Sequence, residues 1–315
     1  MKNKVTIIGA GGVGASTAYS LLAREAASEV VLIDVNVDKA LGEALDIKQA
    51  TPFLGNSDIY AGDYRDAAGS QFVIITSGMG RKPGQTRLEL VQTNVEIIRK
   101  ISSEIVKYAP NAIYIMVANP VDILTYAFLK FTGLPKSQVI GTGTLLDTIR
   151  LRTRLAEIYG VNKKQVHANV LGEHGDSSFI AWSTATIAGV PLAEYNQSVA
   201  TKYSLPTDYT NQEIEEYVKK SGGKIISRKG STVYGIATTS MHIVDTISGN
   251  AGTLMTVSSL HDGEYGIKDV CLSSLSLVDR TGLKSIIAQN LSDDEIKNLH
   301  NSAAVLKDII KSAGL

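Results

Sequence analysis

The sequence predicts an α/β protein: a doubly wound parallel sheet followed by a second domain of α+β type. Short apolar runs alternate with longer amphipathic stretches in the first half, and this pattern changes after about residue 150. Apolar runs that do not alternate with polar residues are typical of strands buried on both faces by crossover helices. We therefore expect two domains, residues 1–142 and 143–315.

The expected elements of the first part follow the β-α-β order of crossover connections. The strands are expected at residues 5–8, 30–33, 72–76, 112–117 and 139–141, and the helices at 13–23, 39–50 and 88–108. In the second part, strand patterns at 166–171 and 253–260 mix with helical patterns at 211–221, 235–248 and 293–311.

The composition excludes some classes of protein. The chain has 315 residues, 44% of them hydrophobic, and its 31 Lys and Arg residues balance its 31 Asp and Glu residues. Without a net positive field, we expect no nucleic-acid or membrane partner. No apolar stretch approaches the length of a membrane span. The single cysteine, Cys271, cannot form an internal disulfide and resembles strand core, so a cytoplasmic location is expected.

A glycine motif between the first strand and the first helix predicts a nucleotide site. Gly9, Gly11 and Gly14 fit the pattern G-x-G-x-x-G, which lets the backbone approach a pyrophosphate at a helix N-terminus. Asp34 ends the second strand, where a carboxylate can bind ribose hydroxyls and repel a 2′-phosphate. The alternative is that Asp34 begins a turn or caps a helix. Together these features favour a Rossmann domain that binds NAD rather than NADP.

Two later segments offer groups for proton transfer beside a carboxylate. His174, between Gly172 and Gly175, is the candidate acid/base, because its pKa lies near neutrality. Asp147 is the expected orienting carboxylate, whereas Asp176 could equally make a structural turn. Arg150 supplies a guanidinium fork that suits a substrate carboxylate. No metal site is expected.

These motifs, taken in order, resemble those of the L-lactate/malate dehydrogenase family over nearly the full length of the chain. The matching segments are residues 9–14, 34, 81–87, 117–122, 146–150, 172–176 and 232–237. The resemblance implies an NAD-dependent oxidoreductase that transfers a hydride between NAD(H) and a small (S)-2-hydroxy acid. It also implies a homodimer or homotetramer. A non-catalytic NAD-sensing protein is a remote alternative, since a sensor does not need all of these groups.

The resemblance also implies individual roles. His174 would be the acid/base, Asp147 its orienting partner, and Arg87 the group that polarises the carbonyl. Substrate-binding positions would be Arg81, Arg87, Asn119, Arg150 and Thr232; cofactor-binding positions would be Gly9, Gly11, Gly12, Val13, Gly14, Asp34, Asn119 and Ile236.

Arg81 lies in a loop, residues 78–87, that would close over the substrate. Relatives specific for lactate typically carry glutamine at this position, and relatives specific for malate carry arginine. Because Arg81 could neutralise the second carboxylate of oxaloacetate, we expect a malate dehydrogenase. Glu173, Thr232 and residues 184–189 instead resemble the lactate branch, so L-lactate dehydrogenase is the alternative.

Arg152 and His167 match positions at which bacterial lactate dehydrogenases bind fructose 1,6-bisphosphate across a subunit interface. Paired across a two-fold axis, these side chains could form an anion site. The equally weighted alternative is a helix-surface arginine and a strand-edge histidine without a ligand.

Overall fold

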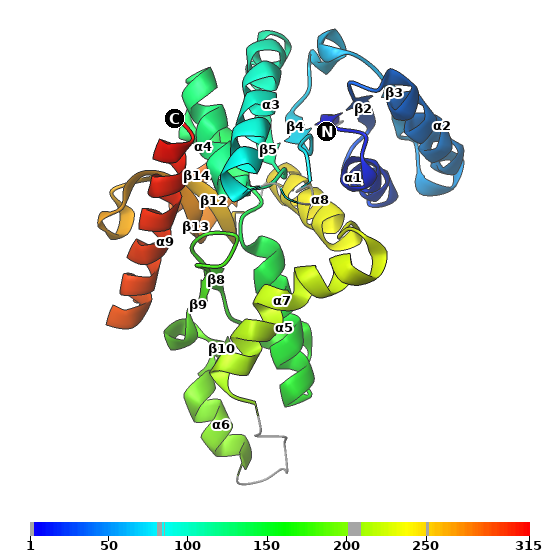
Figure 1. The fold of residues 1–315 in the computed structure, drawn as a ribbon. Coiled ribbons are helices and arrows are strands. Elements are labelled where there is room, and N and C mark those ends of the chain that lie inside the picture. The colour runs from blue at the N-terminus through cyan, green and yellow to red at the C-terminus, as the bar shows by residue number, and fades with distance from the viewer. Residues whose placement is uncertain (1–2, 81–83, 85, 201–208, 250–251) are drawn as a thin grey trace.

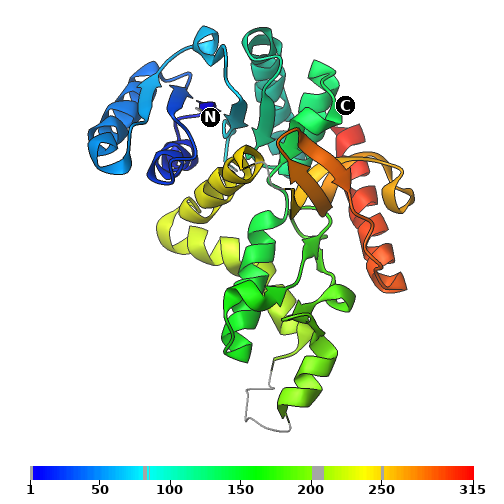
Figure 2. The ribbon, with the colours of Figure 1, turned by 180° about the vertical axis from the view of Figure 1, so that it is seen from behind.

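The computed structural model describes residues 3–80, 84, 86–200, 209–249 and 252–315. Its described residues form a nine-stranded sheet with helices on both faces, and a second lobe extends below this sheet in Figure 1. Figure 2 shows the same two parts from behind. The predicted doubly wound α/β fold is confirmed.

Six strands of the sheet are parallel and lie in the order β3-β2-β1-β4-β5-β6, which is typical of Rossmann domains. They are β1 (Lys4–Ile8), β2 (Glu29–Ile33), β3 (Asp58–Ala61), β4 (Phe72–Ile75), β5 (Ile113–Met116) and β6 (Val139–Gly141). Three antiparallel strands extend the β6 edge: β12 (Thr253–Asp262), β13 (Lys268–Asp279) and β14 (Gly282–Ile286). The join is the pairing of Ser258 in β12 with Gly141 in β6.

Helices bury the two faces of the sheet in separate apolar clusters. One cluster is formed with α1 (Gly12–Ala23), α2 (Val37–Leu54) and α8 (Tyr234–Ser248). The other is formed with α3 (Arg87–Tyr108), α4 (Val121–Thr132) and α9 (Asp293–Ser312).

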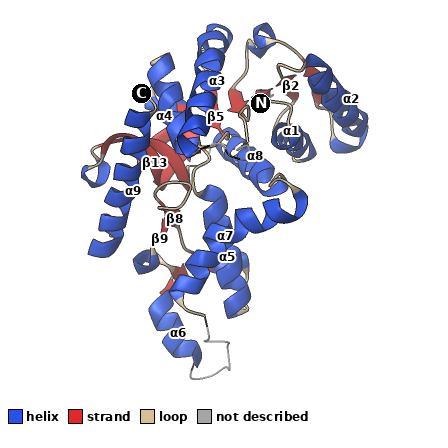
Figure 3. Ribbon diagram, viewed as in Figure 1, coloured by secondary structure: helices blue, strands red, loops and turns tan. Residues whose placement is uncertain are grey.

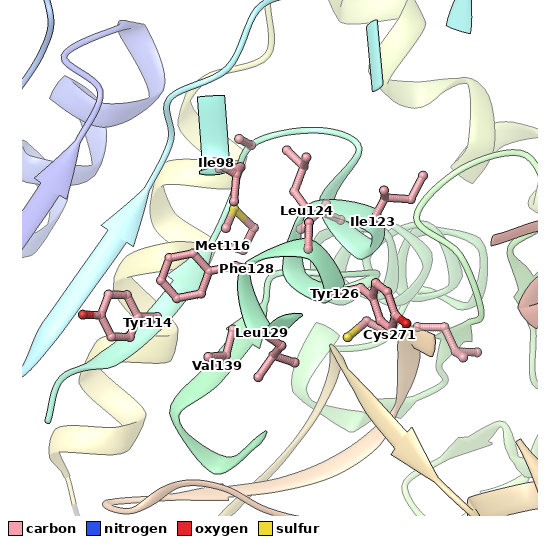
Figure 4. Close-up of a cluster of buried hydrophobic side chains, with 14 of the residues drawn as sticks. Ile98, Tyr114, Met116, Ile123, Leu124, Tyr126, Phe128, Leu129, Val139 and Cys271 are labelled. Carbon is pink, nitrogen blue, oxygen red and sulfur yellow. The ribbon is translucent and has the colours of Figure 1, made fainter. Parts of the chain in front are cut away.

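Helix α4 is the most buried of these, and Figure 4 shows the side chains packed around it. The Tyr114 ring of β5 lies 4.8 Å from the Phe128 ring of α4, centroid to centroid. Cys271 of β13 is fully buried in the same cluster, in agreement with its predicted place in a strand. This core fixes α4, whose first turn reaches the site described below.

The second lobe has its own small core. It contains α5 (Leu145–Tyr159), α6 (Leu192–Ala200), α7 (Asn211–Lys229) and five short strands, and Figure 3 shows that helices dominate it. The strands are β7 (Val166–His167), β8 (Val170–Leu171), β9 (Phe179–Ile180), β10 (Thr186–Ile187) and β11 (Val190–Pro191).

The structure differs from the expected elements in the second half. The strand expected at residues 166–171 is split into β7, which pairs with β10, and β8, which pairs with β9. Between them, the Ala168 carbonyl accepts a hydrogen bond from Nε of Arg152 at 3.0 Å. The predicted division at residues 142 and 143 stays a prediction, although β12, β13 and β14 join the sheet of the first half. Among the described residues, no helix is long and apolar enough to span a membrane.

The turn from β1 into α1 requires glycine at two positions. Gly9 has a φ of +113°, and a Cβ there would lie 2.9 Å from the Ser77 backbone nitrogen. A Cβ on Gly14 would lie 1.8 Å from the Gly9 carbonyl oxygen, whereas one on Gly11 would have no neighbour within 4 Å. The turn is therefore closed too tightly at Gly14 for any side chain.

We expect Gly14→Ala to lower the free energy of unfolding of the ligand-free protein by about 3 kcal/mol, because a backbone atom cannot yield to the new methyl group. Alanine is otherwise the better helix former by about 1 kcal/mol, so the loss measures the clash. Chemical denaturation checks this, with Gly11→Ala as the control that leaves stability unchanged. Equal stability of both variants would contradict the packing described here.

Candidate active site

The N-terminus of α1 is open toward the carboxyl edge of the sheet. Gly11, which precedes α1, provides no side-chain cap, and the first turn has no acidic residue. By contrast, α3, α7 and α9 each begin with a capping box. An uncapped helix N-terminus beside open space is suited to a phosphate group. The turn therefore fits the pyrophosphate of a dinucleotide.

Asp34 lies beside this turn at the end of β2. Its Oδ2 accepts a hydrogen bond from the Ala10 backbone N–H at 2.6 Å, and its Oδ1 accepts one from Asn36 at 2.9 Å. Asn36, not Asp34, caps α2 through the Lys39 N–H. The turn role that was weighed as an alternative is thus present, and the carboxylate is also placed beside the glycine turn as the NAD prediction requires.

His174 contacts Asp147, as predicted from the sequence, and Arg150 pairs with the same carboxylate, a contact that was not predicted. Asp147 lies in the first turn of α5, and its Oδ2 is 2.6 Å from Nδ1 of His174. Its other oxygen, Oδ1, accepts a hydrogen bond from Nη1 of Arg150, one turn along the helix, at 2.6 Å. No described residue hydrogen-bonds Nε2 of His174. The Asp147 contact therefore leaves the distal nitrogen available for a proton-transfer partner.

His174 and Asp147 each shift the pKa of the other toward the charged form. Burial alone would lower the pKa of His174, but the Asp147 carboxylate outweighs burial and raises it above the ordinary value. Burial alone would likewise raise the pKa of Asp147, but His174 and Arg150 outweigh it and lower that pKa. The imidazolium is consequently retained to a higher pH than for a free histidine.

The Asp122 carboxylate holds the backbone of His174 in place, a contact that the sequence analysis did not predict. This carboxylate, in the first turn of α4, is buried, and its Oδ2 accepts the His174 backbone N–H at 2.7 Å. Burial raises the pKa of Asp122 to about 6, against the opposing effects of the Ser258 hydroxyl and the His174 N–H. The segment 117–122 drew attention to this region, but not to the contact.

The loop that carries His174 is tied to the sheet on its other side. Gly172 forms an isolated bridge with Ser273 of β13, with both backbone hydrogen bonds at 2.9 Å. The Ser273 hydroxyl also accepts the Thr144 N–H at 3.0 Å, just before α5 begins. Ser273 therefore links the two segments that bring His174 and Asp147 together. No sequence motif marks this serine.

Arg87 and Asn119 reach the site from the carboxyl ends of β4 and β5. Arg87 is the first residue of α3 rather than part of a free loop, and its guanidinium contacts Glu173 at 2.5 Å. Asn119 is exposed, and the Asn94 side-chain amide donates to its backbone carbonyl at 2.7 Å. Arg87 was expected at the end of the loop 78–87, and the structure instead places it at the start of α3. The roles of Arg87 and Asn119 stay predictions.

The start of α8 closes the space between the nucleotide turn and α5. A Cβ on Gly12 would lie 3.4 Å from Val233, and one on Gly235 would lie 3.2 Å from Leu146. Thr232 and Ile236, both half-buried, flank these contacts. The roles expected for Thr232 and Ile236 stay predictions.

Two described positions, Arg152 and His167, form no hydrogen bond or ion pair with this group, and a third predicted position lies outside the described residues. Arg81 lies outside the described residues. Arg152 is half-buried, and two of its N–H groups donate within the chain, one to the Ala168 carbonyl and one to the Asn169 side chain, at 3.0 Å each. Burial lowers the pKa of Arg152. His167 is exposed in β7. An anion site at Arg152 and His167 stays a prediction.

Family models match both parts of the chain. The NAD binding domain of lactate/malate dehydrogenases matches residues 3–141, and the alpha/beta C-terminal domain of the same family matches residues 144–314. The first match identifies residues 3–141 as an NAD-binding domain, in agreement with the predicted cofactor.

Individual relatives extend over the whole chain. An L-lactate dehydrogenase of Acetivibrio thermocellus is 45% identical over 98% of this chain and 96% of its own length, and one of Clostridium perfringens is 44% identical over 99% and 98%. The crystal structure of a minor L-lactate dehydrogenase from Enterococcus mundtii superposes with a TM-score of 0.93 at 39% identity, covering 99% of this chain and 98% of that one.

These relatives contradict the prediction of a malate dehydrogenase acting on malate/oxaloacetate. That prediction placed one side chain, Arg81, above the resemblance of Glu173, Thr232 and residues 184–189 to the lactate branch. The physical argument for Arg81 required a buried contact with a second carboxylate, and the structure does not describe this side chain. Similarity along the full chain outweighs that single position.

We expect Asp147→Asn to lower the pKa of His174, because burial then acts without the opposing carboxylate. An NMR pH titration of the His174 imidazole measures this. Asp176→Asn is the control, since that carboxylate is 97% exposed and contacts Arg87 rather than the imidazole. An unchanged His174 titration in Asp147→Asn would contradict the assigned pairing.

Proposed function

The chain belongs to the lactate/malate dehydrogenase family, and we propose that within it the protein is an NAD-dependent L-lactate dehydrogenase that interconverts (S)-lactate and pyruvate. The observation that carries the reaction type is the shared carboxylate of Asp147, which holds His174 on one oxygen and Arg150 on the other. An acid/base and a carboxylate-binding cation are thereby fixed at neighbouring points. The choice of lactate over malate is supported by the relatives that match the full chain.

The proposed roles follow from what each group can donate or accept. Arg150 binds the carboxylate of pyruvate through guanidinium N–H groups other than the one given to Asp147. His174 donates a proton from Nε2 to the carbonyl oxygen during reduction and accepts it back during oxidation. Asp147 stabilises the imidazolium in between. Arg87 donates to the same oxygen as negative charge develops on it.

When bound, the cofactor would donate or accept the hydride at the substrate carbon whose oxygen exchanges a proton with His174. The groups that would hold it are the glycine turn with the N-terminus of α1 at the phosphates and Asp34 at the ribose. Ile236 is proposed to pack on the nicotinamide, and Asn119 to bind the reacting oxygen beside it. Closing the pocket near Thr232 would keep water from the reacting carbon.

Two further parts of the proposal concern the protein as a whole. We propose a homodimer or homotetramer, supported by the exposed apolar side chains Leu41, Leu45 and Phe53 along α2. A cytoplasmic location is proposed because the single cysteine, Cys271, cannot form an internal disulfide.

We expect kcat/KM to be at least about tenfold higher for pyruvate than for oxaloacetate, with NADH as the reductant. Absorbance at the nicotinamide band measures both rates with the same enzyme. D-lactate is the control for the reverse reaction, because a site built for the (S) isomer should not oxidise it. A higher kcat/KM for oxaloacetate, or equal use of both lactate isomers, would overturn the proposal.

The raised pKa of His174 determines the expected pH dependence. Pyruvate reduction needs the imidazolium, so its kcat/KM should be constant in acid and fall as pH rises through a value above 6.5. Lactate oxidation needs the neutral ring, so its kcat/KM should rise as pH rises through the same value.

His174→Asn should lower kcat by about 10³-fold and leave NADH binding, measured by fluorescence, intact. Retained turnover in this variant would remove the assignment.

A further inference from the structure

Asp122 is a buried carboxylate that none of the proposed steps uses. It is the acidic residue in the first turn of α4, it is 2% exposed, and its Oδ2 accepts the His174 backbone N–H at 2.7 Å. Pro120, which precedes α4, provides no side-chain cap. A negative charge at this end of a helix is favoured by the helix dipole. The start of α4 therefore offsets part of the cost of burying an ionised carboxylate.

The charge of Asp122 is not cancelled by a cation of its own. In the described part of the chain, Oδ2 contacts the backbone of His174, and Oδ1 is buried without a hydrogen-bond partner of ordinary geometry. Asp147 differs, because it divides its two oxygens between His174 and Arg150. The negative charge of Asp122 is therefore free to act on the group that its backbone contact brings close, which is His174.

The charge of Asp122 completes the balance around the imidazole. When His174 is protonated, it and Arg150 carry two positive charges, and Asp147 carries one negative charge. Burial lowers the pKa of His174, Asp147 raises it, Asp122 raises it further, and Arg150 lowers it. Asp122 thus supplies the second negative charge that two buried cations require.

The Asp122 carboxylate is ionised over the pH range in which His174 loses its proton. Burial raises the pKa of Asp122 to about 6, Glu173 adds to this rise, and the Ser258 hydroxyl and the His174 N–H oppose it. The pKa of His174 is raised above 6.5. The Cys271 thiol of β13 adds no charge, because burial raises its pKa. The charge of Asp122 is therefore present while the imidazole titrates.

We propose that Asp122 is a positioning residue that acts through His174: it holds the backbone of the histidine loop, and its negative charge keeps the imidazole in the proton-donating form beside the Arg150 cation. Water screens a buried charge only weakly, so the charge acts in addition to the hydrogen bond. The effect of Asp122 on rate rests on the proposed function, whereas its effect on the titration of His174 does not.

Asp122→Asn removes the charge and keeps an amide oxygen that can accept the His174 N–H. We expect the midpoint of the His174 imidazole titration, followed by NMR, to fall by about half a pH unit or more, because one carboxylate then opposes both burial and Arg150. The shift should be smaller than in Asp147→Asn, since Asp122 contacts the backbone rather than the ring. An unmoved midpoint would overturn the inference.

The same variant separates charge from shape in pyruvate reduction. The pH at which kcat/KM falls to half should move down by the same amount, which corresponds to an about threefold lower rate at a pH above both midpoints. The plateau of kcat/KM in acid should be retained. A purely structural Asp122 would lower the plateau and leave the midpoint in place, and that result would contradict the proposed role.

The matched control is Glu295→Gln. Glu295 is also a buried carboxylate in the first turn of a helix, α9, and it accepts the Ser183 backbone N–H at 2.9 Å. This variant removes a buried charge and keeps an acceptor in the same way, but away from the His174 loop. Both midpoints should stay at their wild-type values. Equal shifts in the two variants would show a general effect of altered packing and would exclude the role of Asp122.

A measurement on the wild-type protein tests the charge even if Asp122→Asn fails to fold. The His174 backbone N–H donates to Asp122, so the chemical shift of this amide proton reports the ionisation of the carboxyl group. We expect a change in this shift near pH 6, below the midpoint of the imidazole. If the shift changed only at or above the imidazole midpoint, the charge would be absent while His174 titrates, and the inference would be wrong.

Turnover and titration together separate the proposed function from the role of Asp122. If the wild-type protein failed to reduce pyruvate while Asp122→Asn lowered the imidazole midpoint, the proposed function would fail and the role of Asp122 would stand. If both proteins reduced pyruvate with the same pH profile, the role of Asp122 alone would fail.

Discussion

The buried carboxylate of Asp147 is the interaction on which the site depends. A carboxylate that is 10% exposed is unfavourable unless it is paired, and here both oxygens are used, one by His174 and one by Arg150. Because Asp147 and Arg150 lie one turn apart on α5, the helix sets their spacing. The His174 imidazole lies on a different segment, so contacts from other elements must place it beside α5.

Two supports bring His174 to α5. Asp122, at the start of α4, accepts the His174 backbone N–H, and Ser273 of β13 pairs with Gly172. Helix α4 is packed in the largest apolar cluster, and β13 extends the parallel sheet. The loop that carries His174 is therefore held on one side by α4 and on the other by β13. Because β13 belongs to the antiparallel extension of the sheet, this extension helps to place His174.

The site is balanced in charge without a ligand. Among the described residues, Arg150 pairs with the buried carboxylate of Asp147, which also contacts His174, and Arg87 pairs with that of Glu173. Each guanidinium nevertheless retains N–H groups that can bind a monoanionic keto acid. Under the proposed function, the substrate carboxylate and carbonyl would bind to these remaining N–H groups while both ion pairs persist.

The sequence by itself predicted the parallel sheet, the glycine turn with Asp34 beside it, and the contact of Asp147 with His174. These features are local: periodicity, turn chemistry and short motifs act over a few residues. The substrate was predicted wrongly from the sequence, because the single loop position Arg81 was given more weight than the resemblance of other segments to the lactate branch.

Only the tertiary structure decided the supporting contacts. Glu173, Asp122, Ser273 and Ser302 lie in different segments, and no spacing rule connects a serine in α9 or β13 with a histidine loop far from it in the sequence. Their partners are fixed by the packing of α4, α9 and the added strands, which brings distant backbone groups within hydrogen-bond distance. Local sequence patterns predicted the candidate reacting groups, whereas long-range packing determined which residues hold those groups in place.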